Sequence, residues 1–303
     1  MRTTRRFTPN LLRRWEEIGR GEGKQEDYQP WHQVTRGDPS SRGRSHIINW
    51  AMTGRQHHLL SDGEVVSFYF ATMLPGVVDI REQFPLSRER RQHELCIYDA
   101  FSTPGMYPGT VEISNEIGVR HPVISNRVHE EMWHLTTDLL VTQAIEGKKL
   151  SLLAISVKPR DWNRERRAIE LLKLEREYWV RRKIQWLLIT PEQYSKQVAD
   201  CLRRTAAWVS SYATPSLESM YRCQKLVANH AGESLTFVLM VISQEFETNM
   251  HGAQILFWKS VWRGLIPLDL RRGWRPTEEI ALLSREDFLA LNPLVSGRSA
   301  CLI

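Results

Sequence analysis

Hydrophobic and polar positions along the first 200 residues follow the spacing of helices and strands in turn. Residues 10–20 carry hydrophobic side chains at helical spacing. A second helix begins after Ser61, a good N-cap that has Glu64 three residues later, as in a capping box. A Pro-Gly pair ends this helix, and the stretch VVDIREQFPL that follows has the composition of a strand. This order of elements is the start of an α/β fold.

The middle of the chain predicts a hairpin, a long helix and a buried strand. The stretches MWHLTTDLLVTQ and LSLLAISVK are strand-like, and EGKK between them has the composition of a turn. Residues 161–182 form a charged amphipathic helix, and IQWLLIT is a buried strand. Residues 190–193 supply an N-cap Thr, a Pro at the first helical position and a capping-box Gln for the next helix. We therefore expect an α/β domain over residues 1–200, with a mixed sheet flanked by helices.

The pattern becomes mostly helical beyond residue 210. Three short helices are predicted there, at residues 217–229, 234–247 and 253–263. The stretch GLIPLDLRRGW follows them and has the composition of a strand and turn that would serve as a wing. These features predict a small winged-helix-like domain over residues 211–275 and a tail over residues 276–303.

The bulk composition narrows the class of protein. The chain has 303 residues, of which 42% are hydrophobic, so it is long enough for one large or two modest hydrophobic cores. No apolar run reaches the roughly 18 residues that a membrane span needs, and the basic N-terminus lacks the apolar stretch of a signal peptide. The four cysteines are far apart and lack Cys-x-x-Cys spacing, which argues against zinc and favours a reducing cytoplasm.

An excess of positive charge fits an anionic partner, because the formal net charge is +6. The basic residues near the N-terminus are Arg2, Arg5, Arg6, Arg13, Arg14, Arg20, Lys24, Arg42, Arg44 and Arg55. A basic arm in front of a folded domain commonly holds nucleic-acid phosphates, and the alternative for the first dozen residues is a solvated, disordered tail. We expect Arg42, Arg44, Arg55, His57 and His58 to contact DNA. The two histidines are expected in a loop, where surface positions or metal ligands are the alternatives.

The predicted hairpin brings an acid and a lysine toward each other. Alternation along the two strands places Asp138 on one face of the first strand, and Ser156 and Lys158 on one face of the second. An acid followed roughly 20 residues later by a strand ending in lysine is the pattern of metal-dependent nucleases, in which Asp binds Mg²⁺ and Lys lies near the phosphate. Two alternatives remain at this point: Lys158 marks the edge where the strand meets water, or the pair is a structural salt bridge.

Two glutamates add to this candidate site. Glu64 supplies a second carboxylate, although a capping box alone would explain it. Glu175 lies in the middle of an apolar helix face, where a carboxylate is costly without a partner. Its neighbours at helical spacing are Leu171, Leu172, Tyr178 and Trp179. The partner of Glu175 is Lys158, a metal ion, or an arginine in a structural bridge.

Seven phrases stand in a fixed order within about residues 18–200. They are GRSHIINWAMTGRQHHLLSDGE, DIREQFPL, RHPVI, TTDLLV, ISVKP, KLEREYW and LLITPE. Together they resemble the TnsA family, the endonuclease subunits of the heteromeric transposases of Tn-seven-type elements. The resemblance is thinner beyond residue 210, where only the helical pattern and GLIPLDL correspond to that family.

The resemblance implies a restriction-endonuclease-like fold and Mg²⁺-dependent hydrolysis of DNA. It assigns Glu64 and Asp138 as metal-binding acids and Lys158 as the active-site lysine. The family often has Gln two residues before the lysine, where this chain has Ser156. Because a serine hydroxyl is a poor Mg²⁺ ligand, its role would pass to a water, a backbone carbonyl or Glu175. The expected metal site therefore draws on Glu64, Asp138, Ser156 and Glu175.

The resemblance further implies cleavage of the 5′ strands at transposon ends inside the bacterial cytoplasm. A separate DDE transposase subunit, TnsB-like, would cut and join the 3′ ends. An AAA+ regulator subunit, TnsC-like, would contact the C-terminal part of this chain. The alternatives are a free-standing restriction or repair nuclease on the same fold, and a non-catalytic DNA-binding scaffold whose altered Ser156 position marks a decayed site.

Overall fold

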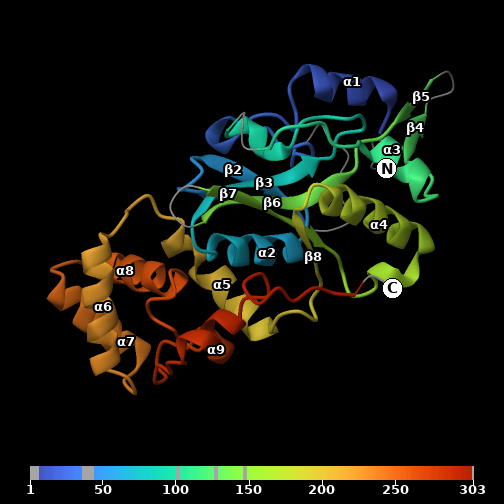
Figure 1. Ribbon diagram of the computed structural model, residues 1–303. Helices are drawn as coiled ribbons and strands as arrows, with labels where there is room; N and C mark the ends of the chain where they lie inside the picture. Colours follow the sequence, from blue (N-terminus) through green and yellow to red (C-terminus); the bar gives the residue numbers. More distant parts are fainter. Residues whose placement is uncertain (1–6, 36–43, 100–102, 126–128, 146–148, 302–303) are drawn as a thin grey trace, which may run out of the picture.

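The computed structural model describes residues 7–35, 44–99, 103–125, 129–145 and 149–301. A four-stranded sheet with the spatial order β3–β6–β7–β8 lies at its centre (Figure 1). Its strands are β3 (Val77–Pro85), β6 (Thr136–Ile145), β7 (Lys149–Val157) and β8 (Gln185–Ile189). The first three pair antiparallel and β8 pairs parallel to β7. The predicted mixed sheet flanked by helices is therefore confirmed.

The remaining elements surround this sheet. Two hairpins pair β1 (His46–Trp50) with β2 (Arg55–Leu59) and β4 (Val123–Ser125) with β5 (Glu130–Met132). The α-helices are α1 (Pro9–Glu17), α2 (Asp62–Thr72), α3 (Thr110–Glu116), α4 (Arg166–Arg181), α5 (Lys196–Val209), α6 (Leu217–Asn229), α7 (Leu235–Glu245), α8 (Met250–Trp262) and α9 (Arg285–Ala290). Single 3₁₀ turns are η1 (Gln25–Asp27), η2 (Glu94–Ile97), η3 (Trp162–Arg164) and η4 (Leu270–Arg272).

Alternating side chains of β6 and β7 divide the core into two layers. Leu139 pairs with Ile155, and both pack with α2 and α5 on one face of the sheet. Leu140 pairs with Ala154, and both pack against α4 on the other face. This two-residue period is what the sequence of the hairpin predicts. It also means that α2 and α4 cover opposite faces of the sheet.

Helix α2 begins where the sequence predicts and α5 does not. Ser61 Oγ accepts a hydrogen bond from the backbone N–H of Glu64, so Ser61 is the N-cap of α2. A side chain at Gly63 would meet Val157 at 3.1 Å, so glycine allows the helix to start close to the end of β7. The predicted start of α5 at Thr190 is wrong, because Gln193 turns back to Thr190 and the helix begins five residues later, after Ser195.

The described part of the predicted basic arm packs on the protein. Leu12 and Trp15 of α1 form a buried cluster with Trp31 and contact the β4–β5 hairpin. Arg13 pairs with Glu131 of β5, and the guanidinium of Arg20 donates to the backbone carbonyl of Trp31. These two arginines therefore make contacts within the fold, and the expected binding of nucleic-acid phosphates by the arm stays a prediction. Residues 1–6 lie outside the described ranges.

The three helices predicted beyond residue 210 are confirmed as α6, α7 and α8. The predicted wing is an isolated bridge between Leu268 and Leu282 beside the turn η4, and within the described chain no longer strand pairing forms there. Trp258 and Trp262 are buried, as expected of core residues. The indole of Trp262 also donates to Thr72 at the end of α2, 3.0 Å away, so α8 joins the sheet-bearing part directly.

The predicted tail returns to the sheet-bearing part. The N–H of Ala300 donates to the carbonyl of Leu188 in β8, and the N–H of Leu188 donates to Ser299. Asn292, which is 3% exposed, donates through Nδ2 to the carbonyl of Phe70 in α2. One hydrophobic cluster runs from Trp50 to Leu294 across both parts of the chain. The domain boundary near residue 210 remains a prediction. No helix in the described ranges has the length and hydrophobicity of a membrane span.

Asn292→Ala should lower the free energy of unfolding by about 1–3 kcal/mol. The buried carbonyl of Phe70 and the N–H of Leu294 would each lose a hydrogen-bond partner. Urea unfolding of the full chain measures the loss. Asn229→Ala, at the exposed end of α6, is the matched control and should change stability by less than about 0.5 kcal/mol. Equal losses in both variants would contradict the tail contact.

Candidate active site

An acid and a lysine meet where β6 begins and β7 ends. Asp138 Oδ2 accepts hydrogen bonds from the backbone N–H of Val157 at 2.6 Å and from Lys158 Nζ at 2.8 Å. Lys158 Nζ also donates to the carbonyl of Val157 at 3.0 Å. The antiparallel register of the two strands produces this approach. The convergence of Asp138 and Lys158 that the sequence predicts is confirmed.

Glu64 reaches the same place from the start of α2. Its Oε2 accepts from the N–H of Leu60 and from Nε2 of Gln83, both at 2.8 Å, and its Oε1 accepts from Ser61 Oγ at 3.0 Å. Burial raises the pKa of Glu64 to about 8, and the negative charge of Asp138 adds to the rise. Glu64 is thus more than a helix cap, because its carboxyl shares an electrostatic environment with the Asp138–Lys158 pair.

Lys158 keeps its charge in this environment. Burial alone would lower the pKa of Lys158, but the carboxylates of Asp138 and Glu175 outweigh burial and raise that pKa above its ordinary value. The ammonium is therefore protonated at neutral pH and does not act as a base. It can stabilise negative charge that develops on a phosphate next to it.

Ser156 and Glu175 form a separate buried group on the α4 side. Ser156 Oγ donates to Glu175 Oε1, which also accepts from Thr137 Oγ1 at 2.7 Å. The indole of Trp186 donates to Ser156 Oγ at 3.0 Å. The hydroxyl of Ser156 thus donates to Glu175 and accepts from Trp186, and its expected role as a metal ligand stays a prediction. An arginine bridge to Glu175 is also absent from the described residues, since hydroxyl and indole groups hold this carboxylate.

The donor set fits a magnesium ion held by two carboxylates. Among the residues that the structure describes, no three His, Cys, Asp or Glu side chains converge tightly enough to hold a metal ion by themselves. The expected set of four ligands, Glu64, Asp138, Ser156 and Glu175, stays a prediction, in which Glu64 and Asp138 supply the carboxylates nearest Lys158. Magnesium commonly binds one or two carboxylates and completes its shell with water and phosphate oxygens. Burial and repulsion that protonate one of two neighbouring acids are relieved when a cation binds.

Burial argues against two of the expected DNA contacts, those of Arg55 and His57, whereas the contact expected of the half-buried His58 stays a prediction. Arg55, His57 and His58 lie on β2 and not in a loop. Arg55 donates through both terminal nitrogens to the carboxylate of Glu82 at 2.8 Å, and His57 Nδ1 lies 2.9 Å from the same group. His57 is fully buried, and the ring of His58 accepts from the N–H of Val34. These side chains therefore support the fold.

The remaining residues expected to contact DNA are Arg42 and Arg44. Arg44 is exposed, and Arg42 lies outside the described residues. Three exposed arginines come shortly after Lys158 in the chain: Arg160, Arg164 and Arg166, with side chains 75%, 78% and 93% exposed. Nothing in the sequence indicates that Gln83 donates to Glu64, because a single amide within a strand pattern carries no signal.

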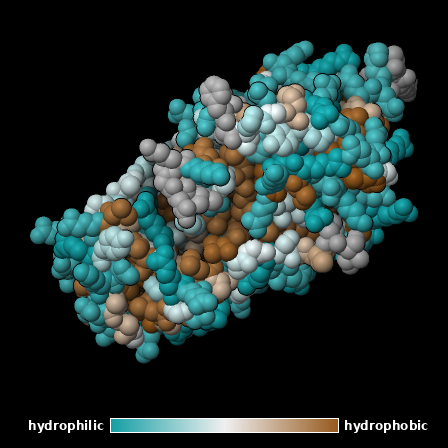
Figure 2. All heavy atoms as spheres, in the orientation of Figure 1, coloured by the Kyte–Doolittle hydropathy of each residue, from teal (hydrophilic) through white to brown (hydrophobic). Residues whose placement is uncertain are grey.

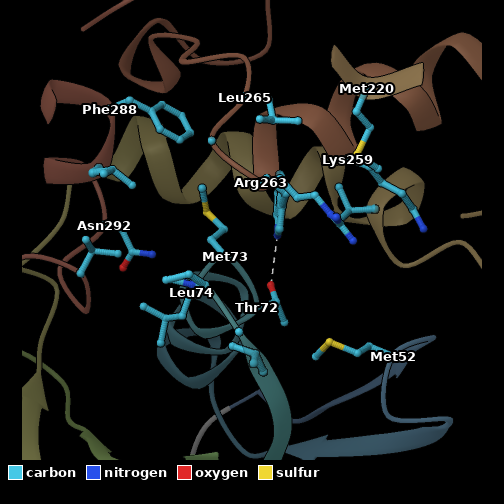
Figure 3. Close-up of a pocket in the computed structure, with 18 of the residues that line it drawn as sticks. Met52, Thr72, Met73, Leu74, Met220, Lys259, Arg263, Leu265, Phe288 and Asn292 are labelled. Carbon is cyan, nitrogen blue, oxygen red and sulfur yellow. Dashed lines mark hydrogen bonds between the residues drawn. The ribbon is translucent and has the colours of Figure 1, made fainter. Parts of the chain in front are cut away.

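A concave region of the surface lies apart from Glu64 and Asp138, which are not among its lining residues. A groove of about 780 Å³ runs between the β1–β2 hairpin, the end of α2 and the C-terminal helices (Figure 3). Figure 2 shows hydrophobic side chains gathered in the hollow between the two parts of the molecule. Met52, Tyr212 and Leu217 line the groove and are 47%, 75% and 55% exposed. Arg263 and Arg285 add positive charge to its lining.

Glu82→Gln should destabilise the protein by about 3–5 kcal/mol at pH 7, because it leaves a buried guanidinium without its carboxylate. Burial raises the pKa of Glu82, but the neighbouring His57 and Arg55 outweigh burial and hold that pKa far below its usual range. A lowered pKa contributes stability above the unfolded value, near 4.5, and this contribution is lost as pH falls further. The difference between variant and parent should therefore shrink below about pH 4.5.

Urea unfolding between pH 3 and pH 8 measures this difference. Glu245→Gln removes a pair with Arg222 in which both side chains are at least half exposed, and it should cost no more than about 1 kcal/mol at any pH. If the loss of stability in Glu82→Gln does not depend on pH, the packing of the Glu82 side chain, and not its negative charge, stabilises the fold.

Comparison with known proteins identifies the family. Residues 74–191 match the family model described as TnsA-like endonuclease N terminal. The transposon Tn7 transposition protein TnsA of Escherichia coli is 34% identical over 209 residues, which are 69% of this chain and 65% of that relative. The chain thus spans about two thirds of its relative's length. The matched region contains Asp138 and Lys158, and five of the seven phrases lie wholly within it. The chain belongs to the TnsA family.

Proposed function

We propose that this chain is a Mg²⁺-dependent DNA endonuclease that cleaves the 5′ strands at transposon ends as a subunit of a heteromeric transposase. The observation that carries the proposal is the meeting of Glu64, Asp138 and a charged Lys158 at one end of the sheet. The family match supports it, since the relative is named as a transposition protein and the family model as an endonuclease. A DDE transposase subunit would act on the 3′ strands.

The chain's own groups would perform distinct tasks in this reaction. Glu64 and Asp138 would hold the cation, which when bound supplies a Lewis acid for the phosphate and a more acidic water. Lys158, which stays protonated, would stabilise the negative charge that grows on the phosphate oxygens. Glu175 would help to keep Lys158 charged from the α4 side. The exposed Arg160, Arg164 and Arg166 would bind backbone phosphates of the same DNA.

Partner binding is the second part of the proposal. We place the AAA+ regulator subunit at the groove beside the C-terminal helices. Exposed methionine, tyrosine and leucine side chains there suit an apolar segment, and Arg263 and Arg285 suit acidic residues next to it. The helices α6 to α8 would form the winged-helix-like unit, with residues 211–275 as the second domain and residues 276–303 as a tail that anchors it.

Asp138→Ala should reduce 5′-strand cleavage by more than about a hundredfold, because it removes one of two carboxylates that hold the cation. The protein should remain folded, since the change also relieves repulsion with Glu64. Strand-specific cleavage of an end-bearing plasmid with the partner subunits and Mg²⁺ measures the effect, and circular dichroism checks the fold. Asp200→Ala, at an exposed position of α5, should cleave like the parent.

Unchanged cleavage by Asp138→Ala would contradict the site. Cleavage of plasmid by the parent chain without partner subunits would favour a free-standing nuclease. A parent chain that shows neither cleavage with its partners nor any dependence on Mg²⁺ would favour the scaffold alternative.

Tyr212→Ala should weaken binding of the regulator subunit about tenfold, since exposed tyrosines in apolar grooves often dominate binding. Isothermal titration of the regulator into the full chain measures the affinity. Tyr221→Ala is the matched control: Tyr221 lies on α6, is 52% exposed and does not line the groove. Equal effects of the two variants would contradict the groove as the binding surface.

A further inference from the structure

Gln83 has an unusual backbone conformation for its position. Its φ is +49°, in the left-handed region that long side chains avoid, although it lies inside strand β3 and is 2% exposed. The structure describes three other non-glycine residues with positive φ, and all of them are exposed: Gln25, Lys183 and Glu247. Residues with a strained backbone conformation cluster at functional sites, where the surrounding contacts hold them in it.

The left-handed residue reverses the alternation of β3. Ile80 packs in the cluster with α2, and by alternation Phe84, four residues later, should share that face. Phe84 packs instead with α4 on the opposite face. The pairing to β6 keeps its register on both sides of the break, with Glu82 opposite Leu139 and Phe84 opposite Thr137. Gln83 therefore lies opposite Asp138, and the break turns its side chain toward α2.

The amide of Gln83 uses this orientation to hold Glu64. Nε2 donates to Glu64 Oε2 at 2.8 Å. Without the break, alternation would aim this amide into the hydrophobic layer under α4, where it would lack an anionic partner. The result is one buried amide that reaches a metal-site carboxylate from the strand that lies beside Asp138.

Neighbouring groups fix the break from both sides. The carboxylate of Glu82 is held by Arg55 and His57. Tyr28 donates its hydroxyl to the carbonyl of Glu82 at 3.0 Å, and the N–H of Trp31 donates to the carbonyl of Gln83 at 3.3 Å. A strained conformation persists only where its surroundings determine it in this way. Arg55 and His57, which were expected to contact DNA, thus support the backbone conformation that directs the Gln83 side chain toward Glu64.

We infer that Gln83 is a positioning residue of the metal site, which orients the Glu64 carboxylate so that it can bind the cation together with Asp138. The inference rests on the proposed function, since it assigns a role within that site. The loss of an outer hydrogen bond to a metal ligand typically weakens metal binding ten- to a hundredfold. The left-handed backbone is then retained because no ordinary strand residue at this position could reach Glu64.

The test measures Mn²⁺ binding to the full chain by isothermal titration, without DNA. Gln83→Met keeps the side-chain volume and removes the amide, and Gln83→Gly removes the amide while taking a φ of +49° without strain. Both variants should bind Mn²⁺ ten- to a hundredfold more weakly than the parent. Gln143→Met, on neighbouring β6 with its amide bonded to the carbonyl of Pro75, is the matched control and should bind like the parent.

A second arm separates positioning from folding. In a Glu64→Ala background, Gln83→Gly should weaken Mn²⁺ binding no further, because its effect passes through Glu64. Parent-like affinity in Gln83→Gly would overturn the inference and show that only the shape of the backbone matters. A further loss in the Glu64→Ala background would overturn it as well. If Gln83→Met fails to fold, Gln83→Gly decides the question. A parent chain that binds no Mn²⁺ would instead overturn the proposed metal site itself.

Discussion

The repulsion between two buried carboxylates, Glu64 and Asp138, is the constraint around which this end of the fold is organised. They come from different elements, the start of α2 and the start of β6, and each needs donors to remain in place. Asp138 receives a backbone N–H and the ammonium of Lys158, whereas Glu64 receives an N–H, a hydroxyl and an amide. Because Glu64 has neutral donors only, burial and Asp138 raise its pKa to about 8. The unequal donors therefore give the two acids different environments, and a cation bound as proposed would relieve the repulsion between them.

The support for these acids extends across the N-terminal third of the chain. The buried Arg55–Glu82 pair links β2 to β3, and Tyr28 and Trp31 bind the carbonyls on either side of the strand break. A buried ion pair contributes little net stability compared with hydrophobic packing, but removal of one partner is costly. We therefore interpret the Arg55–Glu82 pair as a contact that positions strand β3 and adds little net stability. It fixes the place where β3 changes faces and so determines which side chains reach α2.

The two parts of the chain share one hydrophobic cluster, and the connection has consequences for regulation. Trp262 of α8 donates to Thr72, and Asn292 donates to Phe70, so the C-terminal part is bonded to the same helix whose start carries Glu64. The groove between the parts borders the other end of that helix. Under the proposed function, a partner bound there would contact the helix that carries Glu64, at a point about 12 Å along the helix from Glu64 at 1.5 Å per residue. The proposed partner surface and the proposed metal site would thus share one helix.

The sequence by itself determined the elements and the chemistry that depends on local period and spacing. The two-residue period of the hairpin predicted that Asp138 meets Lys158, and the capping pattern predicted the start of α2, because both rest on contacts within a few residues or across one turn. It misjudged Arg55 and His57, because charge alone does not tell a solvated side chain from one paired to a buried acid. Only the tertiary structure decided the direction of the Gln83 side chain, since it depends on a backbone conformation held by residues of β2 and of the N-terminal segment. Local spacing cannot encode such a constraint, because it arises from contacts between segments that are distant along the chain.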